Sequence, residues 1–245
     1  MPRPPRFFIA PSQVSGSRIS VTEGDVRHIA AVLRMKTGDA LLLCDGQGTE
    51  YQVAIAEISK SEIKADIVSH TRREITAPRI TLGQGLPKSD KMDWIVQKAT
   101  ELGVSNIVPL VTARTIVKIK DEEKRISRWQ KIAREAAMQS NRVDIPAIGQ
   151  IVSFKEFLQT HTSEPRTLLL LPWEEGTMPI KDVLRGKQDI TRIVALIGPE
   201  GGFSSVEASM AREKGFHAVS LGQNILRTET AAIAVLSMIG YEYLS

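Results

Sequence analysis

Two loops near the end of the 245-residue chain combine glycines with charged residues, each directly after an apolar run. The first, residues 198–202, reads GPEGG and follows 193–197; the second, residues 222–230, reads GQNILRTET. Both patterns predict a buried strand, a tight loop and then a helix. Because ligands of open α/β sheets bind beyond the carboxyl ends of the strands, we expect the two loops to form one site.

The first loop has the features of a tight turn whose backbone can lie close to a ligand. Adjacent glycines at 201 and 202 let the backbone come close to a bound molecule, because no Cβ intervenes. Ser204 and Glu207 have the spacing of a capping box, which predicts a helix from about Ser205. An ordinary strand-to-helix connection would also use Pro and Gly, so this loop alone leaves that alternative open.

The second loop places Arg227 and Glu229 at the start of the last helix, roughly residues 231–243, with Thr228 or Thr230 as its cap. That helix is apolar on almost every side, which predicts burial against the sheet and against a second subunit. Charged residues at the mouth of a buried helix need partners or a function. An internal ion pair is the structural alternative to a functional role.

Taken together, the two loops (LIGPEGGFS and LGQNILRTETA) resemble the RsmE family of 16S rRNA uridine N3-methyltransferases, which belongs to the SPOUT class. The resemblance extends to segments along the rest of the chain: residues 28–39, 88–92, 97–103, 109–114 and 135–142. Met138 departs from the family, which more often has an acidic residue there. The resemblance implies S-adenosyl-L-methionine as cofactor, a uridine of 16S rRNA in the small ribosomal subunit as substrate, and a homodimer.

The resemblance also assigns site residues. For the cofactor these are Leu171, Ile197, Gly198, Pro199, Glu200, Gly201, Leu221, Gly222, Ile225, Leu226, Thr228 and Thr230, and for catalysis Arg227, Glu229 and Glu200. Ionising a nitrogen whose pKa is about 9 costs about 3 kcal/mol at neutral pH. A guanidinium about 4 Å away offers up to about 4 kcal/mol at an effective dielectric constant of about 20. Arg227 is therefore the first candidate to stabilise the uridine anion, with Arg114 or Arg142 as alternatives, while Glu200 or Glu229 would accept the proton or bind the cofactor.

Basic residues exceed acidic ones in two segments, residues 1–36 and 112–142, although the net charge is only +4. Such segments suit a surface that follows RNA phosphates, although charged surface helices explain much of residues 120–135 equally well. We expect RNA contacts from Arg6, His28, Arg34, Lys88, Lys91, Arg114 and Arg142. No metal site is expected, and the single cysteine, Cys44, excludes an intrachain disulfide and a zinc site built from cysteines.

The pattern of elements predicts two domains. Residues 1–72 resemble a PUA-like, RNA-binding β-barrel, with several short strands around one helix in which Val26, Ile29, Ala30 and Leu33 form the apolar face. From residue 73 to 245, strands alternate with helices, which favours an α/β domain with a mainly parallel sheet. The knot of SPOUT-type domains enters only through the resemblance, since physical rules argue against knots.

Other function classes fit less well. The first loop lacks the lysine that a P-loop nucleotide hydrolase requires. Residues 83–88 lack the third glycine of the dinucleotide fingerprint of a Rossmann-type methyltransferase. No apolar run approaches the length of a membrane span, and no secretory signal is recognised, so a cytoplasmic location is expected. A non-catalytic RNA-binding protein, or a methyltransferase for another RNA, remains the alternative.

Overall fold

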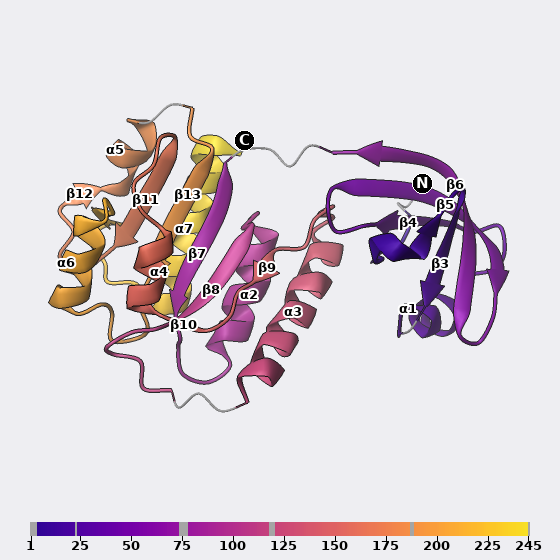
Figure 1. Cartoon of the computed structure of the whole chain (residues 1–245), viewed down its shortest axis with the longest axis horizontal. Helices are drawn as coiled ribbons and strands as arrows, with labels where there is room; N and C mark the ends of the chain where they lie inside the picture. Colours follow the sequence, from indigo (N-terminus) through magenta and orange to yellow (C-terminus); the bar gives the residue numbers. More distant parts are fainter. Residues whose placement is uncertain (1–3, 23, 74–77, 118–120, 187–188, 245) are drawn as a thin grey trace. The chain divides into compact units, whose positions relative to one another are not determined.

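The computed structural model describes residues 4–22, 24–73, 78–117, 121–186 and 189–244, which form two compact units (Figure 1). The first unit comprises Met1–Ile75 and Ala137–Ile145, and the second Thr76–Ala136 and Pro146–Ser245. The expected division placed residues 137–145 in the second domain. They instead pack with the first unit, because Ala137 and Val143 form a hydrophobic cluster with Phe8 and Cys44.

The first unit is a curled six-stranded sheet. Its strands are β1 (Arg6–Phe8), β2 (Val14–Ser15), β3 (Arg18–Thr22), β4 (Ala40–Cys44), β5 (Thr49–Ile58) and β6 (Glu62–Arg72), in the order β1-β4-β5-β6-β3-β2. Only β1 and β4 pair in parallel. Register shifts in β5 after Gln52 and after Ile55 add twist to the two longest strands. The inner face packs around fully buried side chains such as Ile19 and Leu41.

The helix of the first unit differs from the expected one. It starts as α1 (Gly24–Arg27) and continues as a π-helical turn (His28–Val32); a short 3-10 turn, Pro11–Gln13, precedes it in the chain. Val26 and Ile29 are buried as predicted, but Leu33 is 40% exposed. The wider turn explains this difference, because it rotates the residues after it away from the expected apolar face.

The second unit contains a parallel sheet in the order β10-β8-β7-β13-β11-β14-β12, with β9 paired to β8. These strands are β7 (Arg79–Gly85), β8 (Asn106–Val111), β9 (Ala147–Ile148), β10 (Val152–Ser153), β11 (Thr167–Pro172), β12 (Met178–Pro179), β13 (Arg192–Ile197) and β14 (His217–Ser220). The alternation of strands and helices that the sequence predicts is present. The two-residue strands β10 and β12 were not anticipated, because such short segments carry no periodicity.

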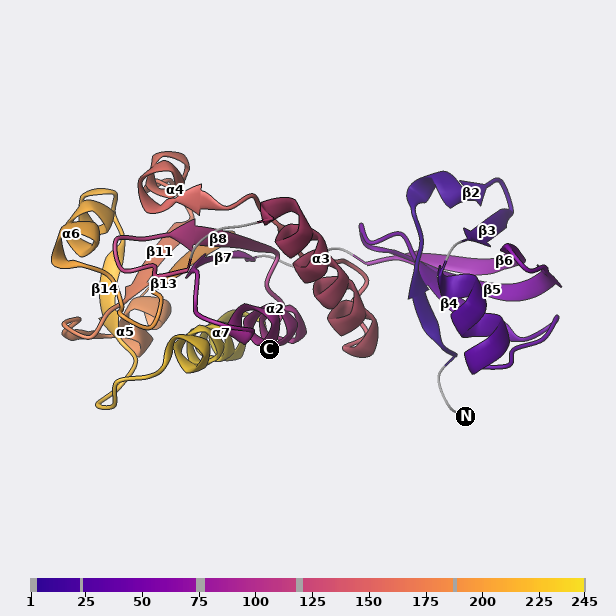
Figure 2. The same cartoon turned by 90° about the horizontal axis from the view of Figure 1, so that it is seen from below.

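Helices cover both faces of this sheet, as Figure 2 shows with the sheet seen nearly edge-on. They are α2 (Lys91–Glu101), α4 (Phe154–Thr160), α5 (Ile180–Arg185), α6 (Ser205–Glu213) and α7 (Thr228–Tyr243); a further helix, α3 (Glu122–Gln139), leads into the 137–145 segment. Helices α4 and α6 lie on one face, and α2, α5 and α7 on the other. Within the described ranges, no helix is long and apolar enough to span a membrane.

Candidate active site

A cavity of about 260 Å³ opens where three neighbouring strands of the second unit end. Its wall comes from the segments that follow β11, β13 and β14, together with the first residues of α7. Because the strands are parallel, their carboxyl ends meet at one edge, which is where α/β sheets bind ligands. The two glycine-bearing loops of the sequence therefore meet at one site.

The cavity wall contains ten of the twelve residues expected to bind a cofactor: Ile197, Gly198, Pro199, Glu200, Gly201, Leu221, Gly222, Ile225, Leu226 and Thr228. The other two do not line it. Leu171 is fully buried in the hydrophobic core beneath the sheet face, and Thr230 is exposed on α7. Leu171 stands one position before the end of β11 and faces the core, whereas Thr230 faces solvent, so their part in cofactor binding stays a prediction.

The wall also contains residues that sequence reasoning missed. Pro172, Trp173 and Glu174 follow β11, and Gly202, Phe203, Ser220, Gln223, Asn224 and Ala231 complete the two loops. The position of Glu174 in the sequence could have indicated this role. It is a carboxylate that directly follows an apolar run, and that run forms a strand ending at the same edge of the sheet as the two loops. It lies against Gly202, where a Cβ would stand 3.1 Å from Glu174 Oε2.

Thr228 connects the two loops through its side chain. Its hydroxyl donates to the Gly198 carbonyl at 2.5 Å and accepts from Gln84 Nε2 at 2.9 Å. Gln84 lies on the central strand β7 and is fully buried. The structure therefore corrects the expected role of Thr228 as a helix cap. Arg227 is the N-cap of α7, and no side chain caps it.

The first loop packs so tightly against the end of β7 that residue 85 must be a glycine. A Cβ on Gly85, at the end of β7, would lie 2.5 Å from Pro199 Cδ and 2.6 Å from Pro199 N. A side chain at Gly85 would push the GPEGG loop away from the sheet, since the backbone of Pro199 cannot yield. Gly85 therefore determines how close the GPEGG loop, which lines the cavity, lies to the sheet.

The helix α6 begins as predicted, with a capping box between Ser204 and Glu207. Glu207 is only 7% exposed, and its other carboxylate oxygen, Oε1, accepts from the Ala113 amide at 2.8 Å. The neighbouring Arg114 donates from Nη1 to the Gly201 carbonyl at 2.6 Å. One carboxylate thus joins the loop after β8 to the start of α6, and this places the Arg114 side chain against Gly201.

Lys91 joins the carboxylates of the two loops. Its Nζ lies 3.3 Å from Glu200 Oε1 and 3.2 Å from Glu229 Oε2. The hydrogen bond to Glu229 raises the pKa of Lys91. Partial desolvation acts in the opposite direction, but the hydrogen bond to Glu200 adds to the increase. Burial pushes the pKa of Glu200 upward, but the backbone amides of Glu200 and Lys88, together with Lys91, outweigh it and leave that pKa lowered. Lys91 and Glu200 are therefore both charged at neutral pH.

Arg227 is exposed at the start of α7, and within the described part of the chain its guanidinium has no ion pair or hydrogen bond. The ion-pair alternative therefore applies to Glu229, whose partner is Lys91, and not to Arg227. Arg227 remains available for a ligand at the edge of the loop that lines the cavity.

Comparison with known proteins decides the family. Residues 74–240 match the model of an RNA methyltransferase domain, and residues 21–68 match an RNA methyltransferase PUA domain. Ribosomal RNA small subunit methyltransferase E of Bacillus subtilis is 33% identical over 231 residues, which cover 91% of this chain and 90% of that protein. The chain belongs to the ribosomal RNA small subunit methyltransferase E family.

Solved structures of the family share the fold. The enzyme from Neisseria gonorrhoeae bound to S-adenosyl methionine is 32% identical with a TM-score of 0.87, over 98% of both chains. A methyltransferase from Legionella pneumophila in complex with the same cofactor is 31% identical with a TM-score of 0.86, again over 98% of both chains. The predicted α/β fold with a PUA-like first domain is confirmed, while the knot stays a prediction.

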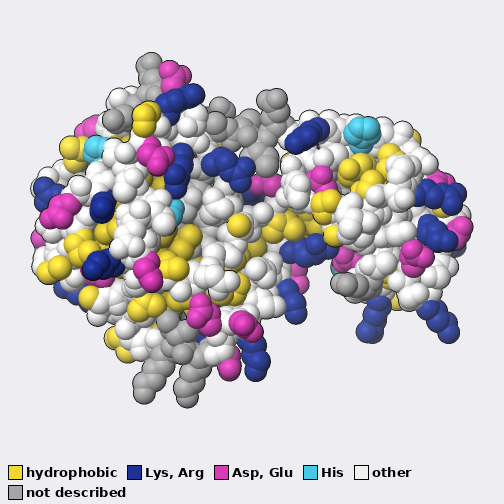
Figure 3. Space-filling view, in the orientation of Figure 1, with side chains coloured by type: hydrophobic (Ala, Val, Ile, Leu, Met, Phe, Trp, Pro, Cys, Tyr) yellow, Lys and Arg dark blue, Asp and Glu magenta, His cyan; other side chains and the backbone are white. Residues whose placement is uncertain are grey.

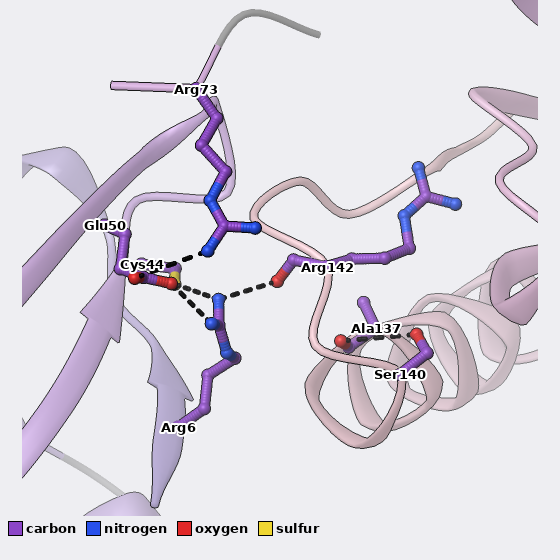
Figure 4. Close-up of polar contacts among 7 residues, drawn as sticks. All are labelled: Arg6, Cys44, Glu50, Arg73, Ala137, Ser140 and Arg142. Atoms are coloured by element: carbon purple, nitrogen blue, oxygen red, sulfur yellow. Dashed lines mark hydrogen bonds and ion pairs between the residues drawn. The ribbon is translucent and has the colours of Figure 1, made fainter. Parts of the chain in front are cut away.

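In this family member, one of the expected RNA contacts has a structural role instead. Arg6 Nη2 forms an ion pair with Glu50, and Nη1 donates to Cys44 Sγ at 3.0 Å and to the Arg142 carbonyl at 3.1 Å (Figure 4). Only 7% of the Arg6 side chain is exposed. A buried and paired guanidinium cannot reach a phosphate group, so the expectation for Arg6 is corrected.

Arg142 is likewise paired, with Nη2 2.7 Å from Asp144 Oδ2 and 12% of its side chain exposed. Lys91 has the two site carboxylates as partners, as described above, so neither basic side chain is free for phosphate. His28, Arg34 and Lys88 are exposed. The His28 ring meets Phe7 edge-on at 5.5 Å, and Arg34 ends its helical segment with a positive φ of 54°.

Proposed function

We propose that this chain transfers a methyl group from S-adenosyl-L-methionine to N3 of a uridine in 16S rRNA of the small ribosomal subunit. The observation that carries the proposal is the single cavity at the carboxyl ends of β11, β13 and β14, into which both family loops project. The relatives named as small-subunit methyltransferases support the substrate.

The lining residues fit the proposed cofactor chemically. Ile197, Leu221 and Leu226 offer apolar surface for an adenosine ring, and the glycines offer backbone groups at close range. Glu174 and Glu200 are carboxylates on the same wall. Their charge suits a ligand that carries a sulfonium and an ammonium group. The Gly222 Cβ position is open, so the backbone can approach a ligand there.

The residues of this chain would divide the work as follows. The bound cofactor supplies an electrophilic methyl group on its sulfonium. Arg227, exposed and unpaired among the described residues, stabilises the uridine once N3 has lost its proton. Glu200 is a poor proton acceptor near neutral pH because its pKa is lowered, and Glu229 is held by Lys91. We therefore assign both carboxylates to shaping the site, and the proton passes to solvent.

We also infer a homodimer in the cytoplasm, where ribosomal subunits are assembled. Ala231, Ala234, Met238 and Tyr241 recur every three or four residues on α7, and none of them is fully buried in the single chain. Such a stripe suits a two-fold interface in which α7 meets its own copy. Ile239, next to Met238, is fully buried, so it belongs to the core of the unit.

The proposal is tested by calorimetry with S-adenosyl-L-methionine, followed by methyl transfer to purified small ribosomal subunits. We expect micromolar cofactor binding in the absence of divalent metal, and incorporation of labelled methyl into the 16S rRNA. A protein that binds RNA but not the cofactor would support the non-catalytic alternative. Incorporation only into another RNA would overturn the substrate.

A further inference from the structure

A second hollow, of about 470 Å³, lies toward the opposite ends of the strands from the proposed active site. Among its lining residues are Arg79 and Thr81 on β7, Asn106 on β8 and Arg192 on β13, with Thr191 and His161 at its rim. None of the lining residues of this hollow is acidic. Figure 3 shows dark-blue and cyan side chains on this side of the molecule.

The hollow exists because α4 is too short to cover the whole sheet face. A Cβ on Gly83 would touch the Phe157 ring of α4 at 2.9 Å, so this face of β7 points toward α4. Side chains alternate along a strand, so Thr81 and Arg79 point to the same side, beyond the end of α4 at Thr160. Parallel sheets are normally covered on both faces, and here a polar strip is left open.

Two arginines stand side by side in this strip. Arg79 and Arg192 are register partners on adjacent strands, so their Cα atoms are about 4.8 Å apart. Like charges directly opposite each other destabilise a sheet unless an anion lies between them. Arg192 has one exposed partner, Glu164, at 3.6 Å, and Arg79 has no ion pair within the described ranges. The free protein therefore offers a carboxylate to only one of the two arginines among the described residues.

We propose that the Arg79–Arg192 hollow binds a phosphate group of the RNA backbone, outside the nucleotide that is methylated. This inference rests on the proposed RNA substrate. Two adjacent guanidiniums match the oxygens of a phosphate, and a concave surface without acidic residues strengthens their field. Arg79 is exposed, so a polymer can reach the hollow.

The distance between the two sites supports a backbone contact. From Arg192 to Ile197, β13 spans five residue steps, which is roughly 17 Å. RNA that places a uridine at the active-site cavity must continue past it, and the hollow offers a cationic position on the α4 face. Burial lowers the pKa of His161, with a further contribution from Arg192, so the charge of the hollow comes from the arginines.

The test compares Arg79→Ala and Arg192→Ala with a matched control, Arg185→Ala. Arg185 is an exposed arginine of the same unit whose carboxylate partner, Glu242, also lies 3.6 Å away. Binding to purified 16S rRNA is measured without cofactor over a range of KCl concentrations. We expect each test variant to bind about tenfold more weakly and to lower the slope of log affinity against log salt by roughly one unit.

Two further readings separate this role from a structural one. Both test variants should keep the thermal stability of the wild type or exceed it, because one of two like charges is removed, and cofactor affinity should stay unchanged. Slopes and affinities equal to those of Arg185→Ala would overturn the inference. A second result would also overturn it: inorganic phosphate raises the melting temperature of the wild type only, while the salt slopes of RNA binding are equal in all variants. The hollow would then bind free phosphate and not RNA. Failure of the wild type to bind cofactor would instead count against the proposed function.

Discussion

Lys91 Nζ lies within 3.3 Å of one carboxylate oxygen from each of the two loops, Glu200 Oε1 and Glu229 Oε2. One cation on α2 thus connects the GPEGG loop to the start of α7. Without Lys91, the two carboxylates would repel each other across the site. Their common partner explains how two acidic residues are held together next to a cavity proposed for a cationic cofactor.

Replacing Lys91 with methionine should lower the melting temperature by about 2 °C at pH 7, because both carboxylates lose a partly exposed partner. The folded-state pKa of Glu200 is lowered, so its contribution is present above its unfolded-state pKa and is lost as the pH falls through the folded-state pKa. The difference between wild type and Lys91→Met should therefore vanish under acidic conditions. Lys98→Met is the control, since Lys98 pairs with Glu101 on the same helix away from the site. Equal deficits in both variants at every pH would contradict the special role of Lys91.

Thr228→Val should destabilise the second unit and weaken cofactor binding together. The change removes the hydroxyl that accepts from Gln84 Nε2, which keeps only the Gly85 carbonyl as acceptor, and it removes the donor to the Gly198 carbonyl, at a cost of about 1–3 kcal/mol. Thr230→Val is the matched control, because Thr230 is exposed two residues later on the same helix. Thermal unfolding and calorimetry measure the two effects. Identical behaviour of the two variants would remove Thr228 from the connection between the loops.

Arg227→Lys should reduce single-turnover methyl transfer by about 10²–10³-fold at pH 7, while the melting temperature stays unchanged because Arg227 is exposed. Lysine keeps the charge but loses the planar fork. Raising the pH toward 9 should restore part of the rate, since solvent then deprotonates more of the uridine. Arg212→Lys, an exposed arginine on α6, is the control. A deficit that stays constant with pH would mean that Arg227 positions the RNA or the cofactor instead.

Met238→Glu should convert the proposed dimer into a monomer, because a carboxylate at the centre of a two-fold interface meets its own copy. Val206→Glu serves as control, since Val206 is an equally apolar residue that is 67% exposed on α6. Light scattering at micromolar concentration is the measurement. A monomeric wild type would refute the dimer directly.

Much of the second unit could be predicted from the sequence, and the reason is periodicity. The strands and helices there are long enough to show it, and the capping box of Ser204 and Glu207 fixed the start of α6. Ten of the residues expected to bind a cofactor line one cavity because both loops are continuous in sequence. Glu174 was missed because its loop has no glycine signature and joins the site only through the strand order.

The expectations that failed concern side chains whose partners lie far away in the sequence. Arg6 looked like a free cation, but Glu50 pairs with it across 44 residues. Lys91 meets carboxylates more than 100 residues later. Composition shows that a segment is basic, but it does not show which charges the fold has already neutralised. The π-helical turn after Arg27 was missed for a different reason, since a single inserted residue leaves almost no trace in a hydrophobic pattern.

The position of the transferred methyl group tests the central claim most directly. Small ribosomal subunits that lack the modification are incubated with the protein and S-adenosyl-L-methionine, and the 16S rRNA is digested to nucleosides for mass spectrometry. The account predicts about one 3-methyluridine per subunit, and much less of it with Arg227→Lys at pH 7. Methyl groups on uridine C5, on a ribose hydroxyl or on another base would contradict it.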